Sequence, residues 1–145
     1  MRKLLAILLV GLTPLLHASD TPNGDFIESI SKYEKIYEND VYNFYIREGV
    51  YQIAPEQYLV HTMVEYILVD GIEYAQLGYS VKRIYNYGML DCNLRVFNLF
   101  SDVFTDSDNI VVYSETYEMD EFKSELMTPN TARNAVYNKV CIEWM

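Results

Sequence analysis

The stretch that decides the fold lies at residues 58–69 and reads YLVHTMVEYILV. Successive side chains of a strand point to opposite faces, so an alternating stretch presents two faces. One face carries Val60, Thr62, Val64, Tyr66 and Leu68, and the other carries His61, Met63, Glu65, Ile67 and Val69. Because both faces are largely apolar, we predict a strand in the centre of a sheet.

The residues after this strand predict a hairpin. Asp70-Gly71 is a tight-turn dipeptide, and it is followed by a second β-rich segment from about Tyr74 to Tyr87. A glycine inside a strand often marks a bulge, so we predict a β-bulge at Gly78. The two segments are therefore expected to pair with each other in an antiparallel arrangement.

Further strands are predicted on both sides of this hairpin. Val41–Ile46 is rich in β-forming residues, and Asp91–Phe104 alternates. The polar cluster at residues 106–109 is a turn signal, and the apolar residues 110–113 after it open the returning strand of a second hairpin. The sequence thus predicts an antiparallel meander of about four to six strands.

Helical spacing marks the two ends of the chain. Apolar residues recur at three- and four-residue steps from Phe26 to Tyr37, which predicts an N-terminal helix capped by Asp25. Thr128-Pro129 has the form of a helix cap followed by proline, and helical spacing continues to Cys141. The predicted fold class is α+β: an antiparallel sheet with the C-terminal helix packed on it, plus an N-terminal helix.

The N-terminus has the features of an export signal. Arg2 and Lys3 precede an apolar run that ends at small residues, and cleavage is expected after Ala18. The alternative is a membrane anchor, but the run is short for a hydrocarbon core of roughly 30 Å, and Pro14 interrupts it. We therefore expect a signal peptide at residues 1–18, no transmembrane segment after cleavage, and one exported domain at residues 19–145, in the periplasm, on the cell surface or secreted.

Charge and composition narrow the classes of partner. Loss of Arg2 and Lys3 leaves 9 basic against 21 acidic residues, a net charge of −12. This charge disfavours nucleic acid and anionic membrane surfaces. The 14 tyrosines suit half-buried sheet faces and also binding surfaces, so they leave a sheet protein and a binding module both open.

Two cysteines, Cys92 and Cys141, follow the export signal. In an oxidising compartment such a pair favours a disulfide, which here would tie the C-terminal helix to the sheet. A redox-active pair is the alternative, but the Cys-x-x-Cys spacing is missing and no neighbouring base lowers a thiol pKa. We predict a structural bridge.

No catalytic or metal-binding set can be assembled from the sequence. His61 is the only histidine after cleavage, and a half-buried residue of the strand is the simplest interpretation of it. The carboxylates at Asp102, Asp106 and Asp108 do not have the spacing of a calcium loop. We therefore expect a protein that is not an enzyme, with no catalytic residue, no metal site and no cofactor.

Several short motifs resemble a known family. Asp91-Cys92-x-x-Arg95, a hairpin, Pro129-Asn130-Thr131 and then Lys139-Val140-Cys141 occur in the order seen in the bacterial surface-adhesin E-like family, small exported proteins of Gram-negative bacteria. The resemblance covers roughly residues 42–141. It implies an antiparallel sheet, a packed C-terminal helix, a Cys92–Cys141 bridge and adhesion to another protein.

Two functional hypotheses follow. The first is a non-enzymatic envelope protein, adhesin-like, that binds a host matrix protein. The second is a periplasmic structural or inhibitory protein that acts on a bacterial envelope protein; a homodimer stays open for both. Tyrosine and arginine are enriched in binding hot spots, so we predict a protein-binding face at Tyr79, Arg83, Tyr85 and Tyr87. The alternative is that this face packs under a terminal helix.

Overall fold

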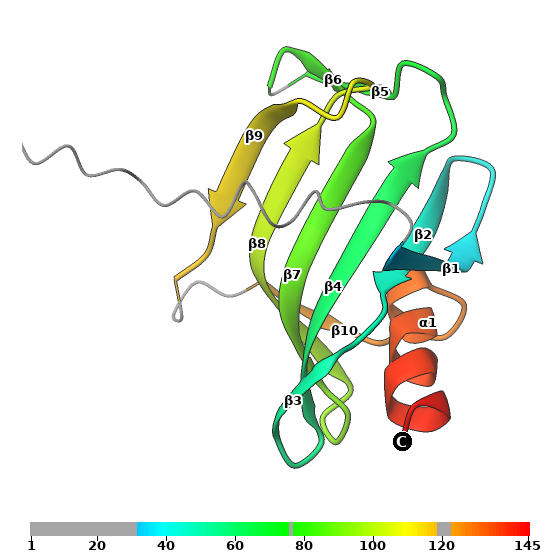
Figure 1. Ribbon diagram of the computed structural model, residues 1–145, viewed down its shortest axis with the longest axis vertical. Coiled ribbons are helices and arrows are strands. Elements are labelled where there is room, and N and C mark those ends of the chain that lie inside the picture. The colour runs from blue at the N-terminus through cyan, green and yellow to red at the C-terminus, as the bar shows by residue number, and fades with distance from the viewer. Residues whose placement is uncertain (1–31, 76, 119–122) are drawn as a thin grey trace, which may run out of the picture.

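A computed structural model of the chain describes residues 32–75, 77–118 and 123–145. Most of these residues form one antiparallel sheet (Figure 1). Its strands are β1 (Tyr33–Glu38), β2 (Tyr42–Arg47), β3 (Tyr51–Ala54), β4 (Gln57–Tyr66), β7 (Arg83–Asp91), β8 (Val96–Thr105), β9 (Val111–Thr116) and β10 (Lys123–Leu126). A separate two-stranded ribbon consists of β5 (Ile72–Tyr74) and β6 (Tyr79–Val81).

The order of strands in the main sheet is β1-β2-β4-β7-β8-β10. Strand β3 pairs with the first part of β4, next to the stretch that pairs with β2. On the far side, β10 pairs with the first part of β8 and β9 with its last part. The described sheet therefore has three long inner strands, β4, β7 and β8, flanked by shorter ones.

The central pair is β4 with β7, which stays in register from Gln57 opposite Asp91 to Glu65 opposite Arg83. Val60 is fully buried on one face of β4 and Met63 on the other. This confirms the prediction from residues 58–69 of a strand with two covered faces. The strand ends at Tyr66, and Ile67–Val69 belong to the loop that follows it.

The C-terminal helix is confirmed. It consists of α1 (Ala132–Asn138), which continues into a π-helical turn, η2 (Lys139–Glu143). The cap, however, is Thr131 and not Thr128: the Thr131 hydroxyl oxygen accepts a hydrogen bond from the Asn134 backbone N–H at 3.2 Å. Pro129 lies in the preceding turn, where Asn130 has a positive φ of 61°, so the chain becomes helical only after it.

The main core lies between the helix and one face of the sheet. We call this face, which includes Val60 and Leu90, the helix-facing side. Val136 and Val140 of the helical segment are fully buried against it. The core residues from the sheet are mostly apolar and include Phe44, Ile46, Tyr58, Val60, Leu90, Phe97 and Leu99. The predicted packing of the helix on the sheet is thus confirmed.

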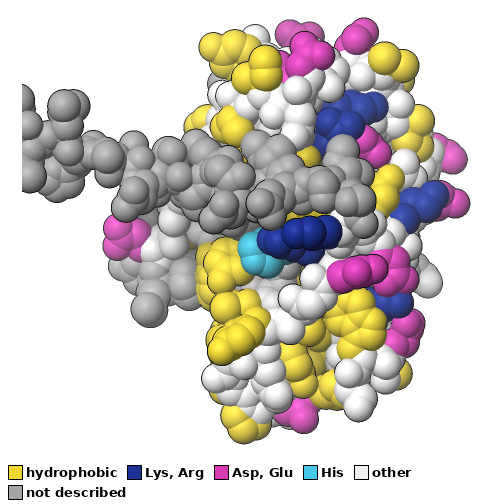
Figure 2. Space-filling view, in the orientation of Figure 1, with side chains coloured by type: hydrophobic (Ala, Val, Ile, Leu, Met, Phe, Trp, Pro, Cys, Tyr) yellow, Lys and Arg dark blue, Asp and Glu magenta, His cyan; other side chains and the backbone are white. Residues whose placement is uncertain are grey.

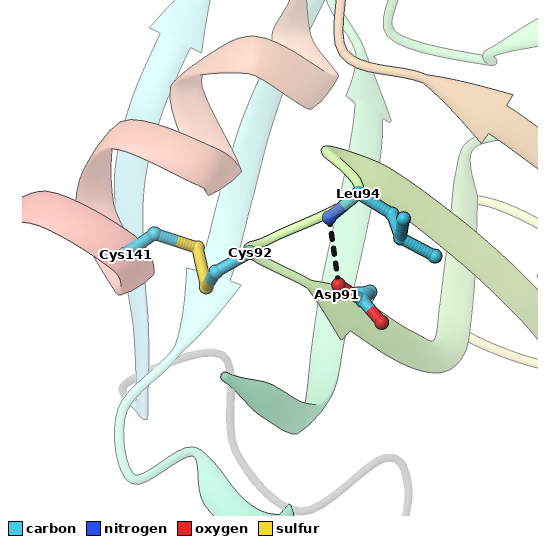
Figure 3. Close-up of a disulfide and its surroundings, with 4 residues drawn as sticks. All are labelled: Asp91, Cys92, Leu94 and Cys141. Atoms are coloured by element: carbon cyan, nitrogen blue, oxygen red, sulfur yellow. Dashed lines mark hydrogen bonds between the residues drawn. A yellow bond between two sulfur atoms is a disulfide. The ribbon is translucent and has the colours of Figure 1, made fainter. Parts of the chain in front are cut away.

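A disulfide joins Cys92 to Cys141 with 5.8 Å between the two Cα atoms, as predicted (Figure 3). Cys92 follows the last residue of β7, and Cys141 lies in η2. The turn beside Cys92 is closed by Asp91, whose carboxylate accepts a hydrogen bond from the Leu94 backbone N–H at 2.8 Å. The bridge therefore fastens the helical segment to the end of an inner strand.

Two predicted strands are shorter than expected. The segment from Tyr74 to Tyr87 is divided into β5, β6 and β7, and Gly78 lies in the turn between β5 and β6 with a φ of 68°. The predicted bulge at Gly78 is therefore wrong, because the glycine serves a turn. Residues 92–95 also form a turn, so β8 begins at Val96 and not near Asp91.

The N-terminal helix is not seen in the part of its segment that the structure describes. Residues 25–31 lie outside the described residues, and Tyr33–Glu38 is strand β1. A register shift between Lys35 and Tyr37 places Ile36 and Tyr37 side by side on partly covered positions. This bulge imitates the three- and four-residue steps of a helix. Within the described residues, neither α1 nor η2 is long and apolar enough to cross a membrane.

Candidate functional site

Three of the four residues predicted as a binding face lie together on β7. Arg83, Tyr85 and Tyr87 occupy alternate positions, on the face opposite the helix-facing side. Arg83 forms an ion pair with Glu65 at 2.8 Å. Tyr85 is only 1% exposed, and its hydroxyl donates to the Asn109 side-chain oxygen at 2.9 Å. The described terminal helix α1 packs on the other face.

Tyr79 is separated from these three residues. It lies in β6, is 57% exposed, and pairs with Tyr74 of β5. Lys82 interrupts the chain between β6 and β7, so the alternation predicted from Tyr79 to Tyr87 is broken. The structure therefore places Tyr79 in a different sheet from Arg83, Tyr85 and Tyr87.

His61 lies half-buried on the face opposite the helix, as predicted. Its ring lies 4.5 Å from that of Tyr87, centroid to centroid. Burial, aided by the charge of Arg47, lowers the pKa of His61 to about 4. Figure 2 shows this face, with the histidine between hydrophobic side chains and a Lys or Arg side chain. His61 is thus neutral at physiological pH and part of the sheet packing.

One end of the sheet carries a group of exposed hydrophobic residues. We name it the apolar tip, formed by Ile67, Leu68, Val69, Tyr79 and Ile110. Val69 is 81% exposed and Leu68 64%. These residues come from the β4–β5 loop, from β6 and from the β8–β9 turn, which all lie at the upper end of the sheet in Figure 1. In Figure 2 hydrophobic side chains are exposed at this end in separate groups, with Asp or Glu side chains between them.

Lys82 and Gly71 hold the loop of the apolar tip in place. The Lys82 ammonium group donates to the carbonyl oxygens of Tyr66 at 2.6 Å and Leu68 at 2.7 Å. Gly71 has a φ of 79°, and a Cβ there would lie 2.1 Å from the Val81 carbonyl oxygen. Only glycine fits so close to a neighbouring backbone. The loop is therefore fixed with its aliphatic side chains outward.

A cavity of about 370 Å³ opens on the helix-facing side, beyond the N-terminus of α1. Its floor comes from β4, β7 and β8, and its walls come from α1, β9, β10 and the β5–β6 ribbon. The lining residues are Val64, Tyr74, Leu77, Ile84, Asn86, Leu99, Asp102, Phe104, Tyr113, Glu115, Tyr117, Lys123, Glu125 and Arg133. One part of the lining is apolar and aromatic, and the other is polar and charged.

Buried polar side chains form the centre of the charged part. Asn86 lies opposite Asp102 in the sheet and donates to its carboxylate at 2.6 Å. The Tyr117 hydroxyl has one proton, which lies within hydrogen-bond distance of the other oxygen of Asp102 at 3.0 Å and of Glu115 at 2.8 Å, and its oxygen accepts from Lys123 at 2.8 Å. Burial raises the pKa of Asp102 despite these hydrogen bonds. The cations nearby have other carboxylates as partners: Arg133 pairs with Glu125 at 2.5 Å, and Lys123 lies 3.9 Å from Glu115.

Sequence reasoning missed this cavity. It considered Asp102 only as a member of a calcium loop, and the structure separates the three carboxylates: Asp102 is buried in β8, while Asp106 accepts hydrogen bonds from the backbone of its own turn. A usable signal was present, because Thr62 is a polar residue at a buried position of β4 and lies opposite Asn86, which lines the cavity. Among the residues described, His, Cys, Asp and Glu side chains form no group of three that could hold a metal ion.

No protein-family model matches the chain, and no curated protein does. Among solved structures, it is similar to protein E from non-typeable Haemophilus influenzae, with a TM-score of 0.55 and 16% identity over 81% of this chain and 80% of that one. Two further structures of Haemophilus influenzae protein E match with TM-scores of 0.54 and 0.52, at 16% and 14% identity. Both matches cover 81% of this chain, and they cover 92% and 89% of the protein E chains. The chain therefore shares the fold of Haemophilus influenzae protein E.

Proposed function

We propose that this chain is an exported, non-enzymatic protein-binding domain that contacts its partner through the apolar tip. The observation that carries the proposal is the run of three consecutive exposed aliphatic residues, Ile67, Leu68 and Val69. A domain gains nothing in its own stability from such a run, and exposed runs of three or more apolar residues are typical of interaction sites.

The fixed geometry of the loop supports this role. A flexible loop would lose conformational freedom on binding, and this loss would weaken the complex. The two hydrogen bonds from Lys82 and the close approach at Gly71 hold the loop in one conformation before a partner arrives. Preorganisation of this kind favours affinity because less entropy is lost.

The residues around the apolar tip suggest the character of the partner. Asp70 and Glu73 are exposed next to the aliphatic run, so the tip has an apolar centre with an acidic rim. Protein interfaces commonly have an apolar core and a polar rim. The matching surface would be an apolar patch flanked by basic residues, on a host matrix protein or on a bacterial envelope protein. A second copy of this chain is less suitable, since two acidic rims would repel.

The predicted face on β7 has a supporting role in this proposal. Tyr79 is the member of the predicted set that belongs to the apolar tip. Tyr85 packs with Met63 and Val103, and Arg83 is paired with Glu65, so both are engaged within the sheet. They position the strands from which the tip extends.

Site-specific photo-crosslinking tests the proposal. A photoreactive amino acid at Leu68 should give an adduct of discrete mass in the native cell envelope, while the same probe at the exposed Glu48 should not. The additional substitution Val69→Ser should remove the Leu68 adduct while the thermal midpoint stays nearly unchanged, because Val69 is exposed. Equal adducts at both probe positions, or none at Leu68, would exclude the apolar tip as the binding surface.

Surface accessibility separates the two functional hypotheses. Protease treatment of intact cells should remove an adhesin-like surface protein and spare a periplasmic one. Protein E supplies a fold in common with this chain and leaves its location open at 16% identity. The same cells opened by osmotic shock provide the control, because the protease then reaches the protein in either location.

A further inference from the structure

The cavity on the helix-facing side is separate from the apolar tip. It combines one buried negative charge with aromatic rings. Its ionisable lining comprises Asp102, Glu115, Glu125, Lys123 and Arg133, which leaves one negative charge in excess. Ion pairs join Arg133 with Glu125 and Lys123 with Glu115. Asp102 is then the carboxylate with no ion pair among the described residues, and it is 8% exposed.

Asp102 retains capacity for a further hydrogen bond. Each carboxylate oxygen can accept two hydrogen bonds. Asn86 donates to one oxygen, and the single proton of the Tyr117 hydroxyl is shared between the other oxygen and Glu115, so each oxygen of Asp102 has a lone pair left in this structure. A donor that carries a positive charge would form the strongest additional bond. It would also offset the cost of burying the carboxylate charge.

Aromatic rings line the cavity next to this carboxylate. Phe104 lies between Tyr74 and Tyr113, with ring centroids 5.6 Å and 5.5 Å apart. Val64 and Ile84 continue the apolar surface toward the centre of the sheet. Aromatic faces attract cations, and aliphatic residues accept the methylene chain of an organic cation. A volume of about 370 Å³ suits a small ligand or one long side chain.

We propose that this cavity binds a primary alkylammonium group, with the ammonium at Asp102 and the methylene chain against Phe104, Tyr74 and Tyr113. Such a group occurs on a free amine or on the lysine side chain of a bound protein. An anion would have to displace Glu125 from Arg133 or Glu115 from Lys123, in a chain with a net charge of −10. The proposal does not depend on the apolar tip.

The test is a titration of the mature protein with n-pentylammonium, followed by NMR chemical shifts of the backbone amides. Shift changes should concentrate on β7, β8 and β9 around the cavity. The neutral isostere n-pentanol should bind at least about tenfold more weakly, because it lacks the charge-assisted hydrogen bond to Asp102. Pentanoate should give no shift changes there. Equal binding of pentanol, or stronger binding of pentanoate, would overturn the proposal.

Two variants link binding to the named residues. Asp102→Asn keeps the size of the side chain and removes its charge, so it should weaken n-pentylammonium about tenfold or more. Glu48→Gln removes the same charge at an exposed position away from the cavity and should change nothing. Tyr113→Leu alters a ring that is 38% exposed, so we expect the variant to fold, and it should weaken n-pentylammonium and n-pentanol by a similar factor of about two to five, because both place their methylene chain against this ring. Unchanged amine binding in Asp102→Asn and Tyr113→Leu would refute the assignment.

A third ligand distinguishes the two sources of the alkylammonium group. Nα-acetyl-lysine methylamide carries the same group on a peptide backbone. Binding similar to that of n-pentylammonium indicates a site for the lysine of a protein partner. Binding of the free amine alone indicates a small-molecule site, because the cavity then excludes the backbone. Absence of shift changes with both cations would overturn the proposal.

Discussion

The helix-facing side of the sheet has two halves that the same strands build differently. In the covered half, under α1, the inner strands present Val60, Leu90 and Phe97, each fully buried. In the open half, beyond the start of α1, they present Asn86 and Asp102 next to the aromatic residues that line the cavity. The change occurs at the row of Thr62, where Arg133 of α1 donates to its hydroxyl oxygen at 3.2 Å.

The difference shows how far one short helix can seal a sheet. Apolar side chains are stabilised where the helix removes them from water. Where the helix stops, buried polar groups are tolerated only if they are hydrogen-bonded, and Asn86, Asp102 and Tyr117 satisfy one another. The covered half thus contributes stability, and the open half offers a cavity with chemical character.

The largest expected effect is on the covered half. Cys141→Ser should lower the free energy of unfolding by roughly 2–5 kcal/mol, because the disulfide closes a loop of 49 residues in the unfolded chain. Urea denaturation of the purified protein measures this change. Cys92→Ser should give a similar loss, and alkylation without reductant should modify neither cysteine in the wild type. Two free thiols in the protein purified without reductant would contradict the structure.

A smaller effect is expected at the point where the covered half begins. Thr131→Ala should cost about 1 kcal/mol, because it removes the side-chain cap that receives the Asn134 N–H. Thr128→Ala is the matched control: Thr128 contributes its backbone carbonyl oxygen to the Thr131 hydroxyl, so its side chain should matter by less than about 0.5 kcal/mol. Thermal unfolding followed by circular dichroism compares them. A larger loss for Thr128→Ala would favour the cap predicted from the sequence.

The smallest effect on stability is expected in the open half. Asp102→Asn should stay within about 1 kcal/mol of the wild type at neutral pH, because the amide retains hydrogen-bonding capacity. Burial raises the pKa of Asp102 above the ordinary 3.8. The folded protein therefore holds this proton more tightly than the unfolded chain, so the contribution of Asp102 to stability is present below pH 3.8 and is lost as the pH rises through the raised value.

The pH dependence sets the direction of the expected difference in stability between Asp102→Asn and the wild type. Relative to the wild type, Asp102→Asn should be least stable at low pH and should gain as the pH approaches neutrality. Thermal midpoints of both proteins across this range measure the difference, and Glu48→Gln serves as the charge control. If Asp102→Asn instead lost stability relative to the wild type as the pH rose, the hydrogen bonds to the ionised carboxylate would outweigh the cost of its burial.

Local pattern was sufficient where one signal decided the structure. The alternation at residues 58–69 identified the central strand, since both of its faces are covered and nothing interrupts it before Tyr66. The turn cluster at residues 106–109 identified the β8–β9 hairpin, where Asp106 binds the backbone of its own turn. The cysteine pair, together with the predicted export signal, identified the bridge. Each of these depends on neighbours in the sequence or on compartment.

Local pattern failed where a register shift or an insertion changed the spacing. The bulge near Ile36 gave helical steps to strand β1. The ribbon of β5 and β6 divided what looked like one strand, because Gly71 and Gly78 both adopt positive φ and turn the chain. The predicted face on β7 lost Tyr79 for this reason, and Tyr85 became buried by residues distant in the sequence.

The sequence by itself determined the class of fold, the antiparallel pairing of its hairpins, the C-terminal helix and the disulfide, because alternation, turn residues and cysteine usage are local or compositional properties. Only the tertiary structure decided which surfaces are available. Exposure of Ile67–Val69 depends on hydrogen bonds from Lys82 and on the close approach at Gly71. The cavity depends on where α1 begins over strands that are far apart in the sequence. Which residues are buried there is therefore a property of the assembled chain.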